Sequence, residues 1–423
     1  MRSASQLCIL IAALALLAVP ADGGPAEPKF SPTGPDAADY GEANGYPIGT
    51  RATSFQIPFL VGAQSHLDQI LPSRDVASPE TAFRFKRAAE EPQITYLSGV
   101  LTVDDYLQRH PATGLLILKD DTILLERYQY ARTDQHRFTS HSMAKTVTAM
   151  LVGIAISDGK IRSVDDRADA YVPELKGTEY GGTSLRALLN MSSGVEFREV
   201  YDGKDDIAKM SRDLHTPGPG KNSAIVVAQF NNRIEPAGAK FKYSSIETEI
   251  LGIVLARAVG MPVADYLSEK IWRRIGAEAK AAWIVDVHGQ EMTYCCLNAV
   301  LRDYARLGRL LAHDGAWPDG NGKVEQIIPR QWVVDATSVR TNDDHLRPGT
   351  ATRFFGYGYQ VWLFPGDTRQ FAFLGIRGQV IFVDPASKLV MVQTAVRKLP
   401  SNDPTAAQTI ALWQGVVKQL GTN

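Results

Sequence analysis

Ser142 and Lys145 form a serine–lysine pair whose spacing suits nucleophilic catalysis. The apolar residues that follow recur with helical spacing and predict a helix that begins near Ser142. Because positions i and i+3 share a helical face, the lysine amine can lie beside the serine hydroxyl. The free N–H groups of the first turn could stabilise an oxyanion. The same spacing recurs at Ser157 and Lys160, but an Asp-Gly stop signal predicts a surface turn there.

A tyrosine in a second segment could take part in the same chemistry. Tyr243 follows a Pro/Gly turn and precedes a predicted helix over Ile246–Val254. An unperturbed tyrosine has a pKa of about 10, so it needs a neighbouring cation such as Lys145 to exchange protons near neutral pH. The structural alternative is Ser142 as a helix cap, Lys145 in solvent and Tyr243 in the core or at a cap.

Two glycines interrupt an apolar strand near the C-terminus. Gly375 and Gly378 stand in a run that otherwise predicts a strand, which is typical of a bulge or of a close backbone approach. If this strand edge faces Ser142, a backbone N–H group here could complete an oxyanion hole with the N–H group of Ser142. A bent edge strand with no role in chemistry is the alternative.

The elements that must position these residues follow from the apolar pattern. Runs at 114–118 and 122–125 flank a polar turn and predict a β-hairpin. Runs at 379–383 and 389–392 predict a second hairpin, and the stretch 140–309 between them is predicted to be helical. Strands at both ends with helices between them predict one shared sheet with helices on its faces, an α+β fold.

The three segments, in this order, resemble the serine β-lactamase and penicillin-binding-protein superfamily, and more narrowly its AmpC-type branch. The similarity rests on Ser142-Met-Ala-Lys145, Tyr243-Ser-Ser245 and Phe373-Leu-Gly-Ile-Arg-Gly-Gln379, and it extends over roughly residues 101–420. In motif, the chain is most similar to 6-aminohexanoate-dimer hydrolase and related esterases. The resemblance implies a serine β-lactamase-like fold, with an antiparallel sheet built from both ends of the chain and a helical subdomain.

The resemblance also implies a hydrolase that cleaves a small ester or amide through an acyl-enzyme, with no metal or cofactor. Ser142 would attack the carbonyl carbon, and Lys145 and Tyr243 would shuttle the proton, with either of them as the general base. The oxyanion donors would be the N–H groups of Ser142 and Ile376, because Ile376 follows the glycine of the third motif.

Two departures from the β-lactamase pattern argue against efficient β-lactamase activity. Ser245 stands where those enzymes carry asparagine, and Phe373-Leu-Gly375 replaces Lys-Thr-Gly. The missing lysine normally meets the carboxylate of a β-lactam or peptide. Arg377 could supply that charge, although a solvated arginine at a strand edge is the simpler expectation. The alternative functions are a catalytically silent binding or sensor module and a weak β-lactamase or DD-peptidase.

Composition excludes several other classes of protein. The chain has 423 residues, with 44% hydrophobic and 22% charged residues, which is enough apolar material for a large core. Its 45 Lys+Arg and 46 Asp+Glu residues give a net charge of −1, so nucleic-acid binding is not expected. Adjacent cysteines seldom bridge, so Cys295 and Cys296 are expected to form no disulfide and have no assigned role. No cysteine–histidine set has zinc spacing.

The N-terminal segment has the features of a secretory signal. Arg2 precedes an apolar stretch over Cys8–Val19 that ends in small residues, which predicts a signal peptide over residues 1–21 with cleavage near Ala21. The mature protein is then expected to be exported, in the periplasm or secreted, with no membrane span. The expected partner is a small ester or amide substrate, and the sequence does not indicate an oligomeric state. Further candidates for residues that border the substrate pocket are Glu196, Tyr201, Trp283 and Tyr357.

The region between the signal and the first hairpin differs in composition from the rest. Residues 22–50 contain five prolines and six glycines, which favours a flexible or extended arm over a packed element. Residues 51–95 are expected to dock on the main domain as an extension. The predicted organisation is therefore a signal peptide, an arm and extension over 22–95, and a β-lactamase-like catalytic domain over 96–423.

Overall fold

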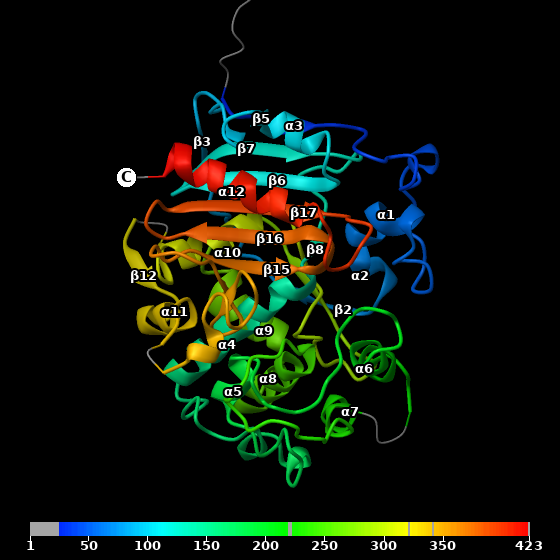
Figure 1. The fold of residues 1–423 in the computed structure, drawn as a ribbon, viewed down its shortest axis with the longest axis vertical. Coiled ribbons are helices and arrows are strands. Elements are labelled where there is room, and N and C mark those ends of the chain that lie inside the picture. The colour runs from blue at the N-terminus through cyan, green and yellow to red at the C-terminus, as the bar shows by residue number, and fades with distance from the viewer. Residues whose placement is uncertain (1–24, 219–221, 320–321, 341, 422–423) are drawn as a thin grey trace, which may run out of the picture.

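The chain, described here as a computed structural model, is built around a nine-stranded sheet (Figure 1). The structure describes residues 25–218, 222–319, 322–340 and 342–421, so the expected signal peptide lies outside the described residues. The strand order is β1-β7-β6-β17-β16-β15-β14-β13, and β3 also pairs with β7. The strands are β1 (Lys29–Phe30), β3 (Lys86–Arg87), β6 (Ala112–Lys119), β7 (Thr122–Tyr128), β13 (Gly356–Tyr357), β14 (Trp362–Leu363), β15 (Phe371–Gly375), β16 (Gln379–Asp384) and β17 (Leu389–Ala395).

The centre of this sheet joins the two ends of the chain. β6 and β7 form the first expected hairpin and β16 and β17 the second, so both predictions are confirmed. β17 pairs antiparallel with β6, and Met391 lies opposite Ile117. Successive side chains of β6 point to opposite faces, so Leu115 packs in one core layer and Leu116 in the other. The predicted α+β fold, with one sheet built from both ends of the chain, is confirmed.

Helices cover both faces of the sheet. α12 (Ala406–Leu420) lies across one face, where Trp413 packs against Phe382 (Figure 1). α10 (Leu301–Ala312) packs on the opposite face against β16, β17 and β6. α4 (Ala144–Ser157) and α8 (Ser245–Val259) lie in the same core layer as α10 and contact each other. The turn His141–Met143, which leads into α4, contacts β15 and β16, so the sheet positions the start of α4.

The expected helical stretch 140–309 is interrupted by two strands of a second sheet, so that expectation was wrong in this part. The second sheet has the order β2-β9-β10-β8. Its strands are β2 (Ser73–Val76), β8 (Phe138–Thr139), β9 (Ala281–Ile284) and β10 (Leu297–Ala299). All residues of β9 are buried, and a short apolar run of this kind does not distinguish a buried strand from a helix. β2 belongs to the expected extension over residues 51–95, so this sheet also ties that segment to the rest of the fold.

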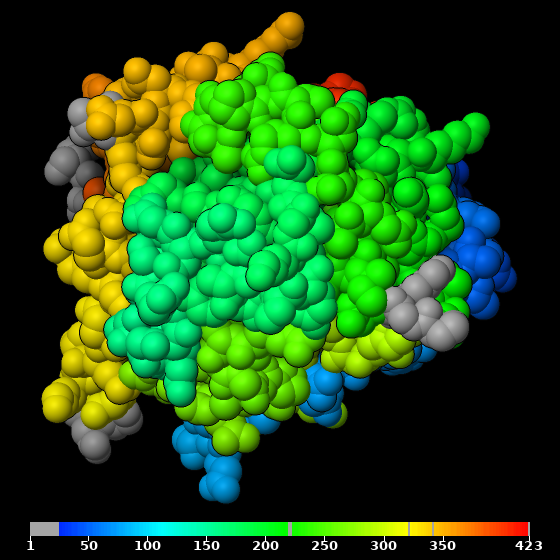
Figure 2. Space-filling view, turned by 90° about the horizontal axis from the view of Figure 1, so that it is seen from below, coloured from blue at the N-terminus to red at the C-terminus, as the bar shows by residue number. Residues whose placement is uncertain are grey.

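Short helices and turns form the end of the molecule away from the main sheet. Figure 2 shows this end, where the segment coloured green fills most of the surface and the blue N-terminal segment lies on one flank. Other helices of the fold, not all of them at this end, are α3 (Val103–Leu107), α5 (Leu185–Leu189), α6 (Asp206–Leu214), α7 (Ser223–Ala228), α9 (Val263–Leu267) and α11 (Arg330–Ala336). The short strand pairs are β4 (Thr95–Tyr96) with β5 (Leu101–Thr102) and β11 (Ala316–Pro318) with β12 (Val324–Gln326).

The described part of the N-terminal segment is packed on the domain, which differs from the flexible arm that its composition favoured. Tyr40 and Tyr46 are buried and place their rings edge-on against Tyr130. The Tyr40 hydroxyl donates a hydrogen bond to the carbonyl oxygen of Val396, at 2.7 Å. α1 (Leu60–Gln64) and α2 (Leu67–Ile70) follow, and every residue of α1 is buried. Aromatic residues between the glycines and prolines therefore hold this segment in place.

Two further surveys concern the described part of the chain. No single helix there is long and apolar enough to cross a membrane. α8 and the segment Val263–Trp272 meet that test only when taken together, with a bend of 76° between them. No group of three or more His, Cys, Asp or Glu side chains in the described ranges could hold a metal ion.

Candidate active site

The serine–lysine pair lies at the buried start of α4. Ser142 is the middle residue of a single 3-10 turn, His141–Met143, which leads directly into α4. Lys145 is 2% exposed, and its Nζ donates hydrogen bonds to Ser142 Oγ at 3.0 Å and to the Tyr294 carbonyl oxygen at 2.8 Å. Burial lowers the pKa of Lys145 to about 8, although the carboxyl groups of Glu199 and Glu249 oppose this shift. The solvated lysine of the structural alternative is therefore wrong.

Tyr243 approaches the same pair from the loop before α8. Lys145 Nζ lies 5.0 Å from the centre of the Tyr243 ring, and Trp362 stacks on that ring at 5.4 Å. Burial is the main cause that raises the pKa of Tyr243, and the negative charge of Glu199 raises it further. The hydroxyl of Ser142 acts in the opposite direction. The phenol is therefore protonated at neutral pH and can donate a proton.

Gly375 brings the expected oxyanion segment against the serine turn. A Cβ atom at Gly375 would lie 2.5 Å from the Ser140 carbonyl oxygen and 3.2 Å from His141 Cβ, so only glycine fits this approach. Ile376 follows at the first position of the turn Ile376–Gly378, and Ser142 is near the first position of its own turn. N–H groups at the start of a helical turn have no partner within it. Ser142 and Ile376 line the same cavity, so their N–H groups remain the candidates for the oxyanion donors.

Glu199 is a functional candidate that the sequence reasoning missed. Ser245 donates to its carboxylate from both the backbone N–H, at 2.6 Å, and Oγ, at 2.7 Å. The Tyr201 hydroxyl donates to the same carboxylate at 2.7 Å. Ser245 thus holds Glu199 near Lys145 and does not act as a helix cap through its side chain. The only sequence signal was a pair of glutamates three residues apart, and the one considered, Glu196, is exposed.

Arg377 is not the solvated edge arginine that was expected. It is 8% exposed, and its guanidinium donates to the carbonyl oxygens of Arg397 and Lys398, each at 2.8 Å. Its backbone N–H donates to the Pro400 carbonyl oxygen, at 2.9 Å. Burial lowers the pKa of the Arg377 side chain. Nη1 of the guanidinium therefore braces the loop after β17, whereas Nε is buried without a hydrogen-bond partner among the described residues.

Two cavities meet at Ser142. The first, called here the Tyr243 cavity, has a volume of about 490 Å³ and is also lined by Phe355 and Trp362. The second, called the extension cavity, has a volume of about 410 Å³ and is also lined by Phe55 and Leu67 of the N-terminal extension. Six residues line both cavities: Ser142, Glu199, Tyr201, Ile376, Arg377 and Pro400. The serine hydroxyl therefore stands where the two halves of a substrate would meet.

The two adjacent cysteines are bonded to each other, which corrects the expectation that they form no disulfide. Cys295 and Cys296 form a disulfide in the loop that also carries Tyr294, the backbone partner of Lys145. Both cysteines line the extension cavity. Trp283, considered from the sequence as a pocket residue, is instead fully buried and donates from its indole N–H to the carbonyl oxygens of Met292 and Cys295. Trp283 therefore supports the disulfide loop through hydrogen bonds from the core.

Tyr201 and Tyr357 had also been considered as residues that border the pocket. Tyr201 lines both cavities, as expected. Tyr357 is 1% exposed and packs edge-on against the Tyr243 ring, at 6.3 Å between ring centres. Tyr357 therefore packs against the Tyr243 ring from within the core.

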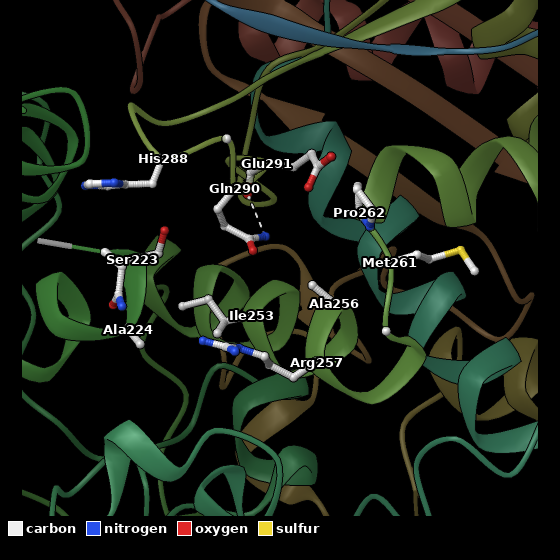
Figure 3. A pocket seen from close by; sticks show the side chains of 13 residues that line it. Ser223, Ala224, Ile253, Ala256, Arg257, Met261, Pro262, His288, Gln290 and Glu291 are labelled. Carbon is white, nitrogen blue, oxygen red and sulfur yellow. Dashed lines mark hydrogen bonds between the residues drawn. The ribbon is translucent and has the colours of Figure 1, made fainter.

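A larger cavity lies away from this site, beside α7 and α8 (Figure 3). Its volume is about 550 Å³, and Ser223, His288 and Glu291 are among the residues that line it. The Glu291 carboxylate accepts a hydrogen bond from Arg74 Nε at 2.8 Å, and Ser223 Oγ donates to Asp286 at 2.6 Å. Ser223 Oγ and the carboxylates of Asp286 and Glu291 are thus engaged in structural bonds.

Comparisons with known proteins agree with this geometry. A family model described as Beta-lactamase matches residues 101–413. The chain is 25% identical over 370 residues to the 6-aminohexanoate-dimer hydrolase of Paenarthrobacter ureafaciens, and the match covers 85% of this chain and 91% of that protein.

Solved structures show the same fold. A Bacillus anthracis protein provisionally described as a 6-aminohexanoate-dimer hydrolase superposes with a TM-score of 0.74 at 23% identity, covering 87% of this chain and 97% of that one. A family VIII carboxylesterase superposes with a TM-score of 0.56 at 16% identity, covering 74% and 93%. The resemblance that the three motifs indicated is confirmed, and the chain belongs to the Beta-lactamase family.

Proposed function

We propose that this chain is an exported serine hydrolase that cleaves a small ester or amide through an acyl-Ser142 intermediate. One observation carries the proposal: the buried amine of Lys145, with a pKa lowered to about 8, lies 3.0 Å from Ser142 Oγ. A nucleophilic hydroxyl needs a base within hydrogen-bonding reach, and a base works best when its pKa is near the ambient pH. Membership of a family of hydrolases supports the same reaction class.

Acylation uses both Lys145 and Tyr243. The neutral amine of Lys145 accepts the Ser142 proton while Oγ forms a bond to the substrate carbonyl carbon. The carbonyl oxygen becomes an oxyanion between the N–H groups of Ser142 and Ile376, which stabilise its charge. The bond from the carbonyl carbon to the leaving oxygen or nitrogen then breaks, and the protonated phenol of Tyr243 donates a proton to the leaving group. Proton transfer from Lys145 restores the phenol.

Deacylation reverses these roles with water. The amine of Lys145 takes a proton from a water molecule as the water oxygen attacks the acyl carbon. The bond from that carbon to Ser142 Oγ breaks, and the proton returns to Oγ. The products are a carboxylic acid and the free enzyme. Because Lys145 also donates to the Tyr294 carbonyl oxygen, the amine is held in one position through both steps.

The substrate carries no strict requirement for a carboxylate. Phe373 replaces the lysine that meets a carboxylate in related β-lactamases, and its side chain is buried, at 2% exposed. Arg377 is tied to two backbone carbonyl groups through Nη1, so its guanidinium is fixed to the loop after β17. We therefore expect slow or no turnover of β-lactams. Relatives named as a 6-aminohexanoate-dimer hydrolase and as a carboxylesterase support an amide or an ester bond as the target.

Export belongs to the same proposal. The first 21 residues have a basic start, a short apolar centre and a small-residue end. A disulfide between Cys295 and Cys296 fits an oxidising compartment such as the periplasm. Mass spectrometry of the N-terminal peptide of the exported protein would test this part: a chain that begins near Asp22 supports it, and a retained Met1 in a cytoplasmic fraction contradicts it.

A substrate panel tests the reaction class. Purified wild-type protein and the Ser142→Ala variant are assayed with p-nitrophenyl esters, short anilides and nitrocefin. We expect ester or anilide hydrolysis that the variant has lost, with slow or absent nitrocefin turnover. Activity of the folded wild type on no substrate would favour a silent binding module. Rapid nitrocefin turnover would instead show a β-lactamase.

A further inference from the structure

The extension cavity has mostly apolar walls that come from two separate parts of the chain. One wall is formed by Phe55, Leu67 and Leu71, which precede the region matched by the family, residues 101–413. Another wall comes from the loop between β9 and β10. Its lining residues are Met292, Tyr294, Cys295 and Cys296. Since the two cysteines are joined, this wall presents a disulfide and no free thiol to the cavity.

The extension wall is fixed beside the nucleophile. Gln64 of α1 hydrogen bonds through Oε1 to the imidazole Nε2 of His141, the residue before Ser142. The Phe55 ring lies 6.3 Å from the His141 ring and 5.9 Å below the guanidinium of Arg377. An apolar group bound against this wall would therefore be held close to the serine hydroxyl.

Several polar groups in the lining are bonded within the protein. The Asp205 carboxylate accepts hydrogen bonds from the backbone N–H groups of Val200 and Tyr201, at 2.7 and 2.6 Å. Glu199 is held by Ser245 and Tyr201, and Arg377 by two carbonyl oxygens. His215 Nδ1 bonds to the Ser211 carbonyl oxygen, at 2.8 Å. His215 Nε2 and Arg377 Nε are buried without a hydrogen-bond partner among the described residues. The lining therefore offers a ligand these polar atoms beside a mostly hydrocarbon and sulfur surface.

The position of the proton donor decides which half of the substrate occupies each cavity. Tyr243 lines the Tyr243 cavity and is absent from the lining of the extension cavity. A leaving group must be next to its proton donor when the bond breaks, so it departs through the Tyr243 cavity. The acyl group stays on Ser142 and must then occupy the opposite side, which is the extension cavity.

We propose that the extension cavity binds the acyl chain of the substrate, and that the enzyme selects hydrocarbon acyl groups longer than acetyl. This inference rests on the proposed serine hydrolase function and adds the chemical class of the acyl group. Phe55, Leu67 and Leu71 are the residues that determine this specificity. A cavity of about 410 Å³ lies within the range of small-molecule sites.

A chain-length series measures the inference directly. The full chain is assayed for kcat/KM with p-nitrophenyl acetate, butyrate, hexanoate and octanoate. Burial of one methylene group raises kcat/KM by about fourfold, so we expect a steep rise from acetate towards hexanoate. A second series keeps the acetyl group constant and lengthens the alcohol, and it serves to assign each half of the substrate to a cavity.

Three variants locate the effect. Leu71→Trp fills the cavity from a half-buried position, and we expect it to lower the hexanoate-to-acetate ratio of kcat/KM by at least about tenfold. Phe55→Ala removes a wall that is 54% exposed, so the fold is retained, and the ratio should fall by several-fold. Phe30→Ala is the matched control, because Phe30 is a 50% exposed residue of the same segment outside the lining. Its ratio should equal that of the wild type.

The outcomes separate this inference from the function on which it rests. Acetate hydrolysis that needs Ser142, with a ratio that neither Leu71→Trp nor Phe55→Ala changes, overturns the acyl site and leaves the hydrolase intact. A Leu71→Trp effect confined to the alcohol series overturns the assignment of the two halves. Absence of hydrolysis across both series, with no Ser142 adduct from a fluorophosphonate, overturns the proposed function and the acyl site together.

Discussion

The two cavities that meet at Ser142 are built in different ways. The Tyr243 cavity is lined by residues from the segments that carry the three motifs, including Tyr243, Gly375 and Ile376. The extension cavity takes its walls from Phe55, Leu67 and the disulfide loop, which carry no motif. In the proposed enzyme, bond cleavage would depend on a few helix starts and one strand edge, whereas the choice of substrate would depend on segments packed around them.

Loss of the Lys145 amine should cause the largest fall in kcat/KM. Lys145→Ala removes the amine beside Ser142, and we expect kcat/KM for an activated ester to fall by on the order of 10³-fold. Lys160→Ala is the matched control, because Lys160 has the same spacing from a serine and is exposed. Equal, small losses in both variants would contradict the assignment of Lys145 as the base.

A steric change at Gly375, at the end of β15, should cause the next largest loss of activity. In Gly375→Ala, the new Cβ atom would lie 2.5 Å from the Ser140 carbonyl oxygen and push Ile376 away from the serine turn. Loss of one oxyanion donor lowers kcat by about 10²-fold. Gly182→Ala is the control, since its Cβ atom would meet only ordinary contacts, at 3.7 Å or more. Wild-type kcat in a folded Gly375→Ala variant would place the oxyanion elsewhere.

The pH dependence should show a smaller effect. Lys145 must be neutral to act as a base and has a pKa of about 8, so kcat/KM should rise with pH and level off above 8. Between pH 7 and pH 9 we expect an increase of about tenfold, measured with a neutral ester.

Glu199 sharpens this test because its negative charge favours the protonated lysine. Glu199→Gln removes that charge, so the pKa of Lys145 falls and the rising limb moves to lower pH. The exposed neighbour provides a control, and Glu196→Gln should leave the limb in place. A limb that does not move in Glu199→Gln would show that this carboxylate does not influence the base.

The smallest effect concerns the docking of the N-terminal segment. Tyr40→Phe removes a buried hydroxyl that donates to the Val396 carbonyl oxygen, and the free energy of unfolding should fall by about 1 kcal/mol. Ester hydrolysis should stay close to that of the wild type, because Tyr40 lines neither cavity. Unchanged stability in chemical denaturation would show that this bond does not anchor the segment.

The residues around Ser142 and the hairpins of the main sheet could be predicted from sequence because their signals are local. Spacing of three residues in a helix brought Lys145 beside Ser142, and alternating apolar runs predicted both hairpins of the main sheet. Gly375 was recognised because glycine in a strand indicates a close backbone approach. Each of these inferences needed only a short window of sequence.

The remaining features depend on contacts between distant segments. Glu199 and Glu196 look alike in sequence, and only the fold of their loop brings Glu199 to Ser245. The buried strand β9 resembles a helical segment in composition, and its partner β2 lies about 200 residues earlier in the chain. Burial of Tyr40 in a glycine- and proline-rich segment likewise depends on a surface formed by residues far along the chain.

One measurement tests the central claim, that Ser142 is the nucleophile, most directly. The folded protein is treated with a fluorophosphonate probe and its intact mass is recorded, together with Ser142→Ala and, as a matched control, Ser157→Ala. We expect one adduct per chain in the wild type and in Ser157→Ala, and none in Ser142→Ala. An adduct that persists in Ser142→Ala, or a folded wild type that forms none with any acylating probe, would contradict the account.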